Sequence, residues 1–240
     1  MEVLVERAGG IATVTLNRPA RRNAMSDALL VELIAVLEAL RDDAAARVVL
    51  LTGAPPVFSA GADAGLRSSM SEVERRQIFL AHKSRFTRLF PRALALLEGL
   101  EQPTLAVLNG HAVGGGWVLA LGCDFRFAEA EAEFWIPEVD LGIPLHAVFT
   151  TRFVRLVGPA RAKEIIMEGR RYTAAEAQAL GLVHRVLTGA ALEATAREHA
   201  RRLALKPARA LAEAKARIAI ITATGIPEVN AMTEGLLERP

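Results

Sequence analysis

The chain has 240 residues, 52% of them hydrophobic, and its 29 Lys and Arg residues nearly balance its 27 Asp and Glu residues. This length can bury one substantial core and allows one domain or two small ones. The near-neutral charge argues against a nucleic-acid-binding protein, which usually has a basic stripe. No apolar run approaches the roughly 20 residues that span a bilayer, so no membrane association is expected.

Cysteine usage and the N-terminus indicate the compartment. Cys123 is the only cysteine, which excludes an internal disulfide framework and fits a reducing environment. Residues 1–7 have charges within their apolar stretch and lack the apolar core of a signal peptide. We therefore expect a cytoplasmic globular protein.

Hydrophobic periodicity predicts strands and helices in alternation, followed by a helical tail. Short apolar or alternating runs bounded by glycine or proline indicate strands, and apolar residues every three to four positions indicate helices. The strands are predicted over residues 2–7, 11–16, 48–52, 104–108, 125–128, 133–135 and 183–186, with an extended segment over 57–62. The helices are predicted over residues 27–41, 71–99, 115–121, 150–157, 159–168, 173–180, 189–205, 207–221 and 227–237.

Local signals support several of these boundaries. Gly9 and Gly10 suit the turn of a hairpin between the first two strands. Ser26 is expected to cap the first helix, and Pro91 is expected to interrupt or kink the helix over 71–99. The alternation of strands and helices predicts an α/β fold with an appended α region.

Two glycine-containing loops are the best candidates for a functional site. The first covers residues 57–63, where a strand runs into a turn of small residues. The second covers residues 109–117 and leads into a helix. Small residues let a ligand approach the backbone closely, and the free N–H groups of a helix start suit an oxygen that gains negative charge. One N–H from each loop would form an oxyanion hole.

Other interpretations of these loops have less support. The glycines at 114–116 would also suit a tight helix start made only for packing. A dinucleotide-binding fingerprint would need glycine where Leu119 stands. Val57 breaks the G-x-S-x-G pattern that would make Ser59 a nucleophile.

Several segments occur in the order that is found in crotonases: residues 17–19, 23–25, 58–63, 109–116, 123–126, 137–144, 156–162 and 174–186. Over residues 2–220 the chain therefore resembles the crotonase (enoyl-CoA hydratase/isomerase) superfamily. The resemblance implies a crotonase-type spiral of ββα units over residues 1–190 and a helical region over residues 191–240. It also implies an acyl-CoA substrate, no separate cofactor because coenzyme A is part of the substrate, and a homotrimer or dimer of trimers.

The resemblance also assigns roles to residues of the two loops. The backbone N–H groups of Ala62 and Gly115 would hold the thioester oxygen, with Gly114 beside them. The coenzyme A portion would meet a further set of residues: Arg22, Ala24, Ala60, Asp63 and Leu66. Arg22 would contact a phosphate, although an ordinary surface arginine is an equal alternative.

Hydratases of this family use two glutamates, one for water and one for the α-proton. The position of the first is Val118 here, and a valine can neither accept a proton nor hold a water. The second corresponds to Glu138, whose pKa would rise toward neutrality if its apolar neighbours enclose it. A surface carboxylate is the alternative for Glu138. One glutamate favours a double-bond isomerase, in which it takes a proton from C2 and returns it at C4.

His146 leaves the reaction partly open. It falls where dienoyl-CoA isomerases and chlorobenzoyl-CoA dehalogenases have a catalytic aspartate, so it could be a second acid or base or could activate water for thioester hydrolysis. It could equally cap the helix after Pro144. The alternatives to an isomerase are an enoyl-CoA hydratase, an acyl-CoA thioester hydrolase and a non-catalytic acyl-CoA-binding paralogue. No metal site is expected, because the five histidines are dispersed.

Overall fold

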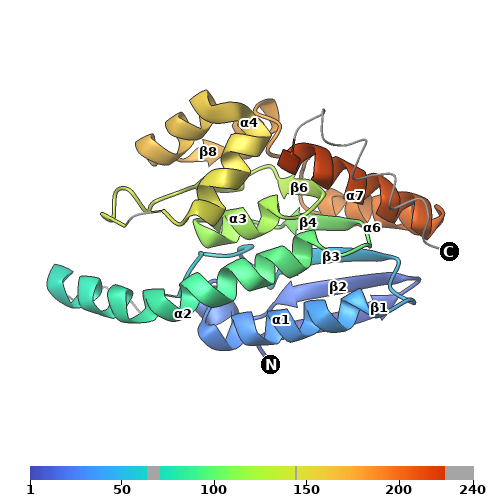
Figure 1. The fold of residues 1–240 in the computed structure, drawn as a ribbon, viewed down its shortest axis with the longest axis horizontal. Helices are drawn as coiled ribbons and strands as arrows, with labels where there is room; N and C mark the ends of the chain where they lie inside the picture. Colours follow the sequence, from blue (N-terminus) through green and yellow to red (C-terminus); the bar gives the residue numbers. More distant parts are fainter. Residues whose placement is uncertain (64–70, 144, 225–240) are drawn as a thin grey trace.

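A six-stranded sheet forms the centre of the molecule, with the strand order β1-β2-β3-β4-β6-β9 (Figure 1). The computed structural model describes residues 1–63, 71–143 and 145–224. β1 and β2 are antiparallel, and every later neighbour in this sheet is parallel. The strands are β1 (Val3–Ala8), β2 (Ile11–Leu16), β3 (Val48–Gly53), β4 (Thr104–Leu108), β6 (Phe125–Glu129) and β9 (Arg185–Leu187). A second sheet contains β5 (Ala112–Val113), β7 (Glu133–Trp135) and β8 (Tyr172–Thr173).

Helices cover both faces of the larger sheet. They are α1 (Asp27–Arg41), α2 (Glu72–Glu98), α3 (Gly115–Leu121), α4 (Ala147–Glu168), α5 (Ala174–Ala179), α6 (Ala190–Ala204) and α7 (Ala208–Thr224), with a short 3-10 helix over Pro19–Arg21. Val49 and Leu51 of β3 face the cluster that includes α1, α2 and α3. Val48 and Leu50 face a second cluster with α6. Because alternate residues of a strand point to opposite faces, a continuous apolar run such as β3 can serve two cores.

The predicted α/β fold with ββα units and a helical C-terminal region is confirmed. Pro91 lies inside α2, which continues to Glu98. The predicted break at Gly158 is present as a non-helical residue (φ 74°, ψ 168°) within α4, and α4 begins three residues earlier than expected. The two-residue strands β5 and β8 were not predicted. The helix expected over 227–237 lies outside the described residues.

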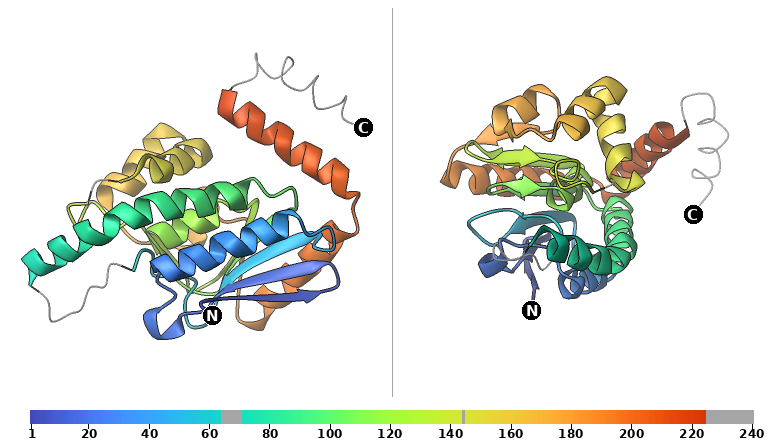
Figure 2. Two further views of the ribbon diagram at one scale, coloured as in Figure 1. Left: turned by 60° about the horizontal axis from the view of Figure 1, so that its bottom comes forward. Right: turned by 90° about the vertical axis from the view of Figure 1, so that its left-hand side faces the viewer.

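The C-terminal helices differ in how they pack. α6 contributes Leu192, Ala196, Ala200 and Leu203 to the second core. α7 runs along the outside (Figure 2), and none of residues 208–222 is buried. The domain boundary expected at residue 190 stays a prediction. Within the described part of the chain, no helix is long and apolar enough to cross a bilayer.

The sheet topology brings the two glycine loops together. β3 and β4 are parallel neighbours, so the segments that leave their carboxyl ends emerge at the same edge of the sheet. In open parallel sheets, ligands bind at this edge. Isolated bridges pair Met25 with Ala62 and Ser59 with Ala112, which joins the loops beyond the strands.

Candidate active site

Two buried polar side chains hold the first loop in shape. The Asn23 amide donates to the carbonyl oxygens of Ala54 and Val57, each at 2.7 Å. The Ser59 hydroxyl donates to the Asn23 carbonyl at 2.8 Å and accepts from the Gly61 N–H at 3.1 Å. Both side chains are fully buried, so these bonds are made in a region that water does not reach. Asn23 and Ser59 therefore fix the turn that presents Ala62.

The second loop lies directly against the first. The Val113 N–H donates to the Ser59 carbonyl at 3.0 Å, and the Phe58 N–H donates to the His111 carbonyl at 3.1 Å. Gly61 has a φ of +88°, and a Cβ added there would lie 2.6 Å from the Val113 carbonyl oxygen. A side chain at Gly61 would thus push the loops apart, which explains the need for glycine at this point.

The Ala62 and Gly115 amides lie on these adjoining turns. A Cβ at Gly61, the neighbour of Ala62, would lie 3.5 Å from the Gly115 nitrogen. Gly115 is the first residue of α3, where an N–H has no intrahelical partner. In the described part of the chain, neither amide donates a hydrogen bond. The two predicted oxyanion donors therefore lie on adjoining turns, and neither has an acceptor among the described residues.

Glu138 lies beside the second loop. Its turn is closed by the Ile143 N–H, which donates to the Glu138 carbonyl at 2.8 Å. A Cβ added to Gly114 would lie 2.6 Å from Glu138 Oε1, so the carboxyl group rests against the residue that precedes Gly115. Oε2 is buried and has no hydrogen-bond partner among the described residues. Burial raises the pKa of Glu138 to about 7, and its own backbone N–H opposes this only partly.

Helix α3 carries apolar side chains at position 118 and beside it. Val118 is fully buried in the core. Trp117 stacks on Phe134 with ring centroids 5.7 Å apart and meets Phe153 edge-on at 5.0 Å. Both residues are part of the core under the loops, and Trp117 belongs to that packing rather than to a ligand surface.

The residues predicted to meet coenzyme A have different surroundings. Arg22 is exposed and in the left-handed region (φ 50°), and its carbonyl accepts a hydrogen bond from the Ala60 N–H at 2.9 Å. Ala24 and Ala60 are half-buried near this contact. Asp63 forms an ion pair of 2.8 Å with Arg18. Arg18 was not predicted as a site residue. Leu66 lies outside the described residues.

His146 caps helix α4. Its Nδ1 accepts a hydrogen bond from the Val148 N–H at 3.2 Å, and the side chain is exposed. Capping is one of the two roles considered for this residue. The acid–base role stays a prediction, and the arrangement of Glu138 with the two loops does not depend on it.

Replacing His146 by alanine is expected to lower the free energy of unfolding by about 0.5–1 kcal/mol, since one N-cap bond is lost. Turnover should stay within about twofold of the wild-type value, because the side chain is exposed and its bond is to the Val148 N–H of its own helix. Urea unfolding and steady-state kinetics measure the two effects. His146→Asn is the matched control, since asparagine caps well and should restore stability. A large fall in turnover at unchanged stability would instead favour the acid–base role.

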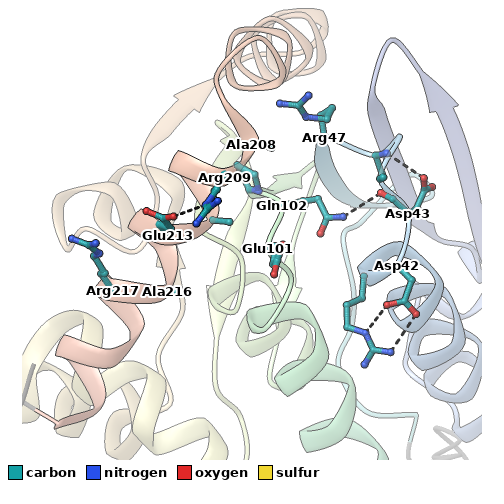
Figure 3. Close-up of a pocket in the computed structure, with 15 residues that line it drawn as sticks. Asp42, Asp43, Arg47, Glu101, Gln102, Ala208, Arg209, Glu213, Ala216 and Arg217 are labelled. Carbon is teal, nitrogen blue, oxygen red and sulfur yellow. Dashed lines mark hydrogen bonds and ion pairs between the residues drawn. The ribbon is translucent and has the colours of Figure 1, made fainter. Parts of the chain in front are cut away.

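A surface pocket of about 660 Å³ lies elsewhere (Figure 3). Its lining includes Arg47 and Pro103, which immediately precede β3 and β4, together with residues of α7. It is therefore at the amino ends of the parallel strands, opposite the glycine loops. Charged groups in its lining bind each other, as in the Arg41–Asp42 pair at 3.1 Å and the Arg209–Glu213 pair at 3.0 Å. This pocket is not part of the candidate site.

Comparison with known proteins places the chain in a family. A family model described as enoyl-CoA hydratase/isomerase matches residues 6–238. The chain is 38% identical over 202 residues to a short-chain-enoyl-CoA hydratase of Clostridium acetobutylicum, which covers 84% of this chain and 74% of the relative. A crystal structure of enoyl-CoA hydratase from Bacillus anthracis superposes with a TM-score of 0.87 at 35% identity, covering 99% and 90% of the two chains. A monofunctional enoyl-CoA isomerase from M. smegmatis superposes with a TM-score of 0.79 at 32% identity, covering 95% and 97%.

Proposed function

The chain belongs to the enoyl-CoA hydratase/isomerase family. We propose that it is an acyl-CoA-processing enzyme that moves the double bond of an enoyl-CoA from the C3–C4 position to the C2–C3 position. The observation that carries this proposal is the contrast between two positions beside the loops. Glu138 is half-buried against Gly114, with its Oε2 atom buried and its pKa raised to about 7, whereas a buried valine occupies position 118. Of these two positions, only 138 thus has a group suited to proton transfer, whereas a hydratase of this family has one at each.

The proposed reaction uses the three elements of the site in sequence. The Ala62 and Gly115 N–H groups donate to the thioester oxygen, and the Glu138 carboxylate takes a proton from C2. The C2–H electron pair then forms the enolate, whose oxygen charge is stabilised by the two donors. Protonated Glu138 returns its proton at C4, and the double bond moves from C3–C4 to C2–C3. Glu138 ends as the carboxylate, so the enzyme is regenerated.

Hydration is the second candidate, because the relatives described above include hydratases. Adding water to the double bond requires a group that orients or activates that water, and Val118 cannot supply one. Thioester hydrolysis and acyl-CoA binding without catalysis remain alternatives. The absence of a separate cofactor and the assembly as a homotrimer or dimer of trimers also stay predictions.

The deciding experiment compares two substrates with the same enzyme preparation. A 3-enoyl-CoA gains ultraviolet absorbance when its double bond becomes conjugated with the thioester, and crotonyl-CoA loses absorbance when water adds. We expect isomerisation to exceed hydration by about 100-fold or more, the lower end of what a positioned acid or base contributes. Hydration at an equal or higher rate would overturn the argument from Val118.

The raised pKa of Glu138 predicts the pH dependence of the reaction. The carboxylate is the form that abstracts a proton, so kcat/KM should rise with pH, reach half its maximum near the pKa of about 7, and level off above it. If Glu138 had an ordinary pKa, kcat/KM would instead reach half its maximum close to pH 4.5. Initial rates at low substrate concentration between about pH 5 and 9 measure the profile. A flat profile through neutral pH would contradict the assignment.

A further inference from the structure

Three apolar side chains converge on the α-carbon of Gly115. A Cβ added to this residue would lie 2.9 Å from Met25 Cε, 3.1 Å from Phe86 Cζ and 3.6 Å from Phe149 Cζ. The three residues come from the loop before α1, from α2 and from the first turn of α4. Met25 also pairs with Ala62, the other predicted oxyanion donor. The backbone at Gly115 is therefore bounded by hydrocarbon on the side where a Cβ would lie.

The two phenylalanines that contact Gly115 both pack against a third, Phe90. Phe86 stacks on Phe90 with ring centroids 5.0 Å apart, and Phe90 meets Phe149 at 5.4 Å. Phe90 and Phe149 are only 1% and 5% exposed, whereas Phe86 is half-buried at the edge. Buried aromatic contacts of this kind resist rearrangement, because a ring that moves leaves a void.

An ion pair also holds together the two helices that carry these rings. Arg152 of α4 donates from Nε to Glu98 Oε1 of α2 at 2.9 Å, and a second bond joins the same two side chains. Arg152 also donates to the Val148 carbonyl, next to Phe149, at 3.1 Å. The Arg152 side chain is largely buried, at 14% exposed. The ion pair thus ties α4, close to Phe149, to the C-terminal end of α2.

We propose that Phe86 and Phe149 form a wall that limits the substrate to short acyl groups, an inference that rests on the proposed function. If a thioester binds to the Gly115 amide, the first carbons of its acyl chain would lie close to both rings. The rings offer no polar partner, so they suit a hydrocarbon chain. An open apolar pocket would strengthen binding by about fourfold for each methylene added. With the wall in place, affinity should stop increasing once the acyl chain is long enough to reach the two rings.

The test measures kcat and KM for 3-enoyl-CoA substrates of six, eight and twelve carbons. For the wild type we expect kcat/KM to fall by about tenfold or more from six to twelve carbons, since a pocket that is too short rejects even small additions. Phe86→Ala should raise the ratio of twelve- to six-carbon kcat/KM by about tenfold, mainly through a lower KM for the twelve-carbon substrate. Phe149→Leu tests the buried half of the wall with a smaller change in volume.

Leu89→Ala is the matched control, because Leu89 is also half-buried on α2. It should retain the wild-type chain-length profile. A flat profile in the wild type, or an unchanged ratio of twelve- to six-carbon activity in Phe86→Ala, would overturn the proposal.

Binding measurements test the chain-length limit independently of the proposed isomerase activity. Calorimetry with saturated butanoyl-CoA and dodecanoyl-CoA needs no turnover. Affinity that does not increase from butanoyl to dodecanoyl in the wild type, and increases in Phe86→Ala, supports the wall even if no substrate is isomerised. Affinity that rises by about fourfold per methylene up to dodecanoyl-CoA refutes the wall while leaving the isomerase proposal intact.

Discussion

Replacing Glu138 by glutamine should lower kcat by about 10²–10⁴-fold, the usual contribution of a positioned acid or base. Glutamine has nearly the same shape and cannot accept the C2 proton. The affinity for acyl-CoA should change by less than about threefold, because the variant leaves untouched the Ala62 and Gly115 amides, the proposed donors to the thioester. Steady-state kinetics and calorimetry with a saturated acyl-CoA measure the two quantities. Unchanged turnover would remove Glu138 from the mechanism.

The same variant has a second expected effect, on stability. Burial raises the pKa of Glu138 above its ordinary 4.5 to about 7, so the folded state holds this proton more tightly than the unfolded chain does. The free energy of unfolding therefore falls as pH rises from about 4.5 to about 7, and a neutral side chain avoids this loss. Glu138→Gln should accordingly raise Tm at pH 8 more than at pH 4. Glu131→Gln, an exposed carboxylate in the preceding turn, should show neither effect. A non-catalytic binding protein would show the stability effect without any turnover to lose.

Replacing Gly114 by alanine should also lower kcat strongly, by about 10²-fold or more, because small displacements of a reacting group carry large penalties. The added Cβ would lie 2.6 Å from Glu138 Oε1, so the carboxyl group has to move. Gly114 also has φ 50° and ψ −122°, a conformation that is strained by about 1–3 kcal/mol for an alanine. Kinetics and urea unfolding on the same preparation separate the loss of activity from the loss of stability.

Gly189 provides a closely matched control for this variant. It is the N-cap of α6 with φ 46° and ψ −129°, and a Cβ added there meets nothing within 4 Å. Gly189→Ala should therefore have a similar loss of stability and keep its activity. Equal losses of activity in both variants would mean that backbone strain, rather than displacement of Glu138, explains the result at Gly114.

Features that depend on neighbours in the chain could be predicted before the fold was known. The hairpin around Gly9 and Gly10 needs only local alternation and a flexible turn. Helix α1 begins where Ser26 was expected to cap it, and the Leu29 N–H donates to the Ser26 hydroxyl at 3.0 Å. Family membership was equally accessible, because motif order is a property of the sequence alone.

Other parts of the fold could not be predicted from local patterns. β5 and β8 have two residues each, so their existence depends on β7 lying between them. Periodicity shows no preferred face in β3, where residues 48–51 are all apolar, and only the packing of α1 and α6 assigns these residues to two cores. Pro91 was expected to interrupt or kink its helix, and α2 is not interrupted there: it runs from Glu72 to Glu98, with Phe90, Ala93 and Leu94 buried around the proline.

For the site, the sequence by itself determined which groups are present: a glutamate at 138, a valine at 118 and two loops of small residues. Only the tertiary structure decided what surrounds them. Glu138 rests against Gly114, 24 positions earlier, and its raised pKa comes from that burial. Phe86 and Phe149 meet at Gly115 from two helices that are far apart in the chain. Desolvation and contact depend on distance through space, which residue spacing along the chain does not specify.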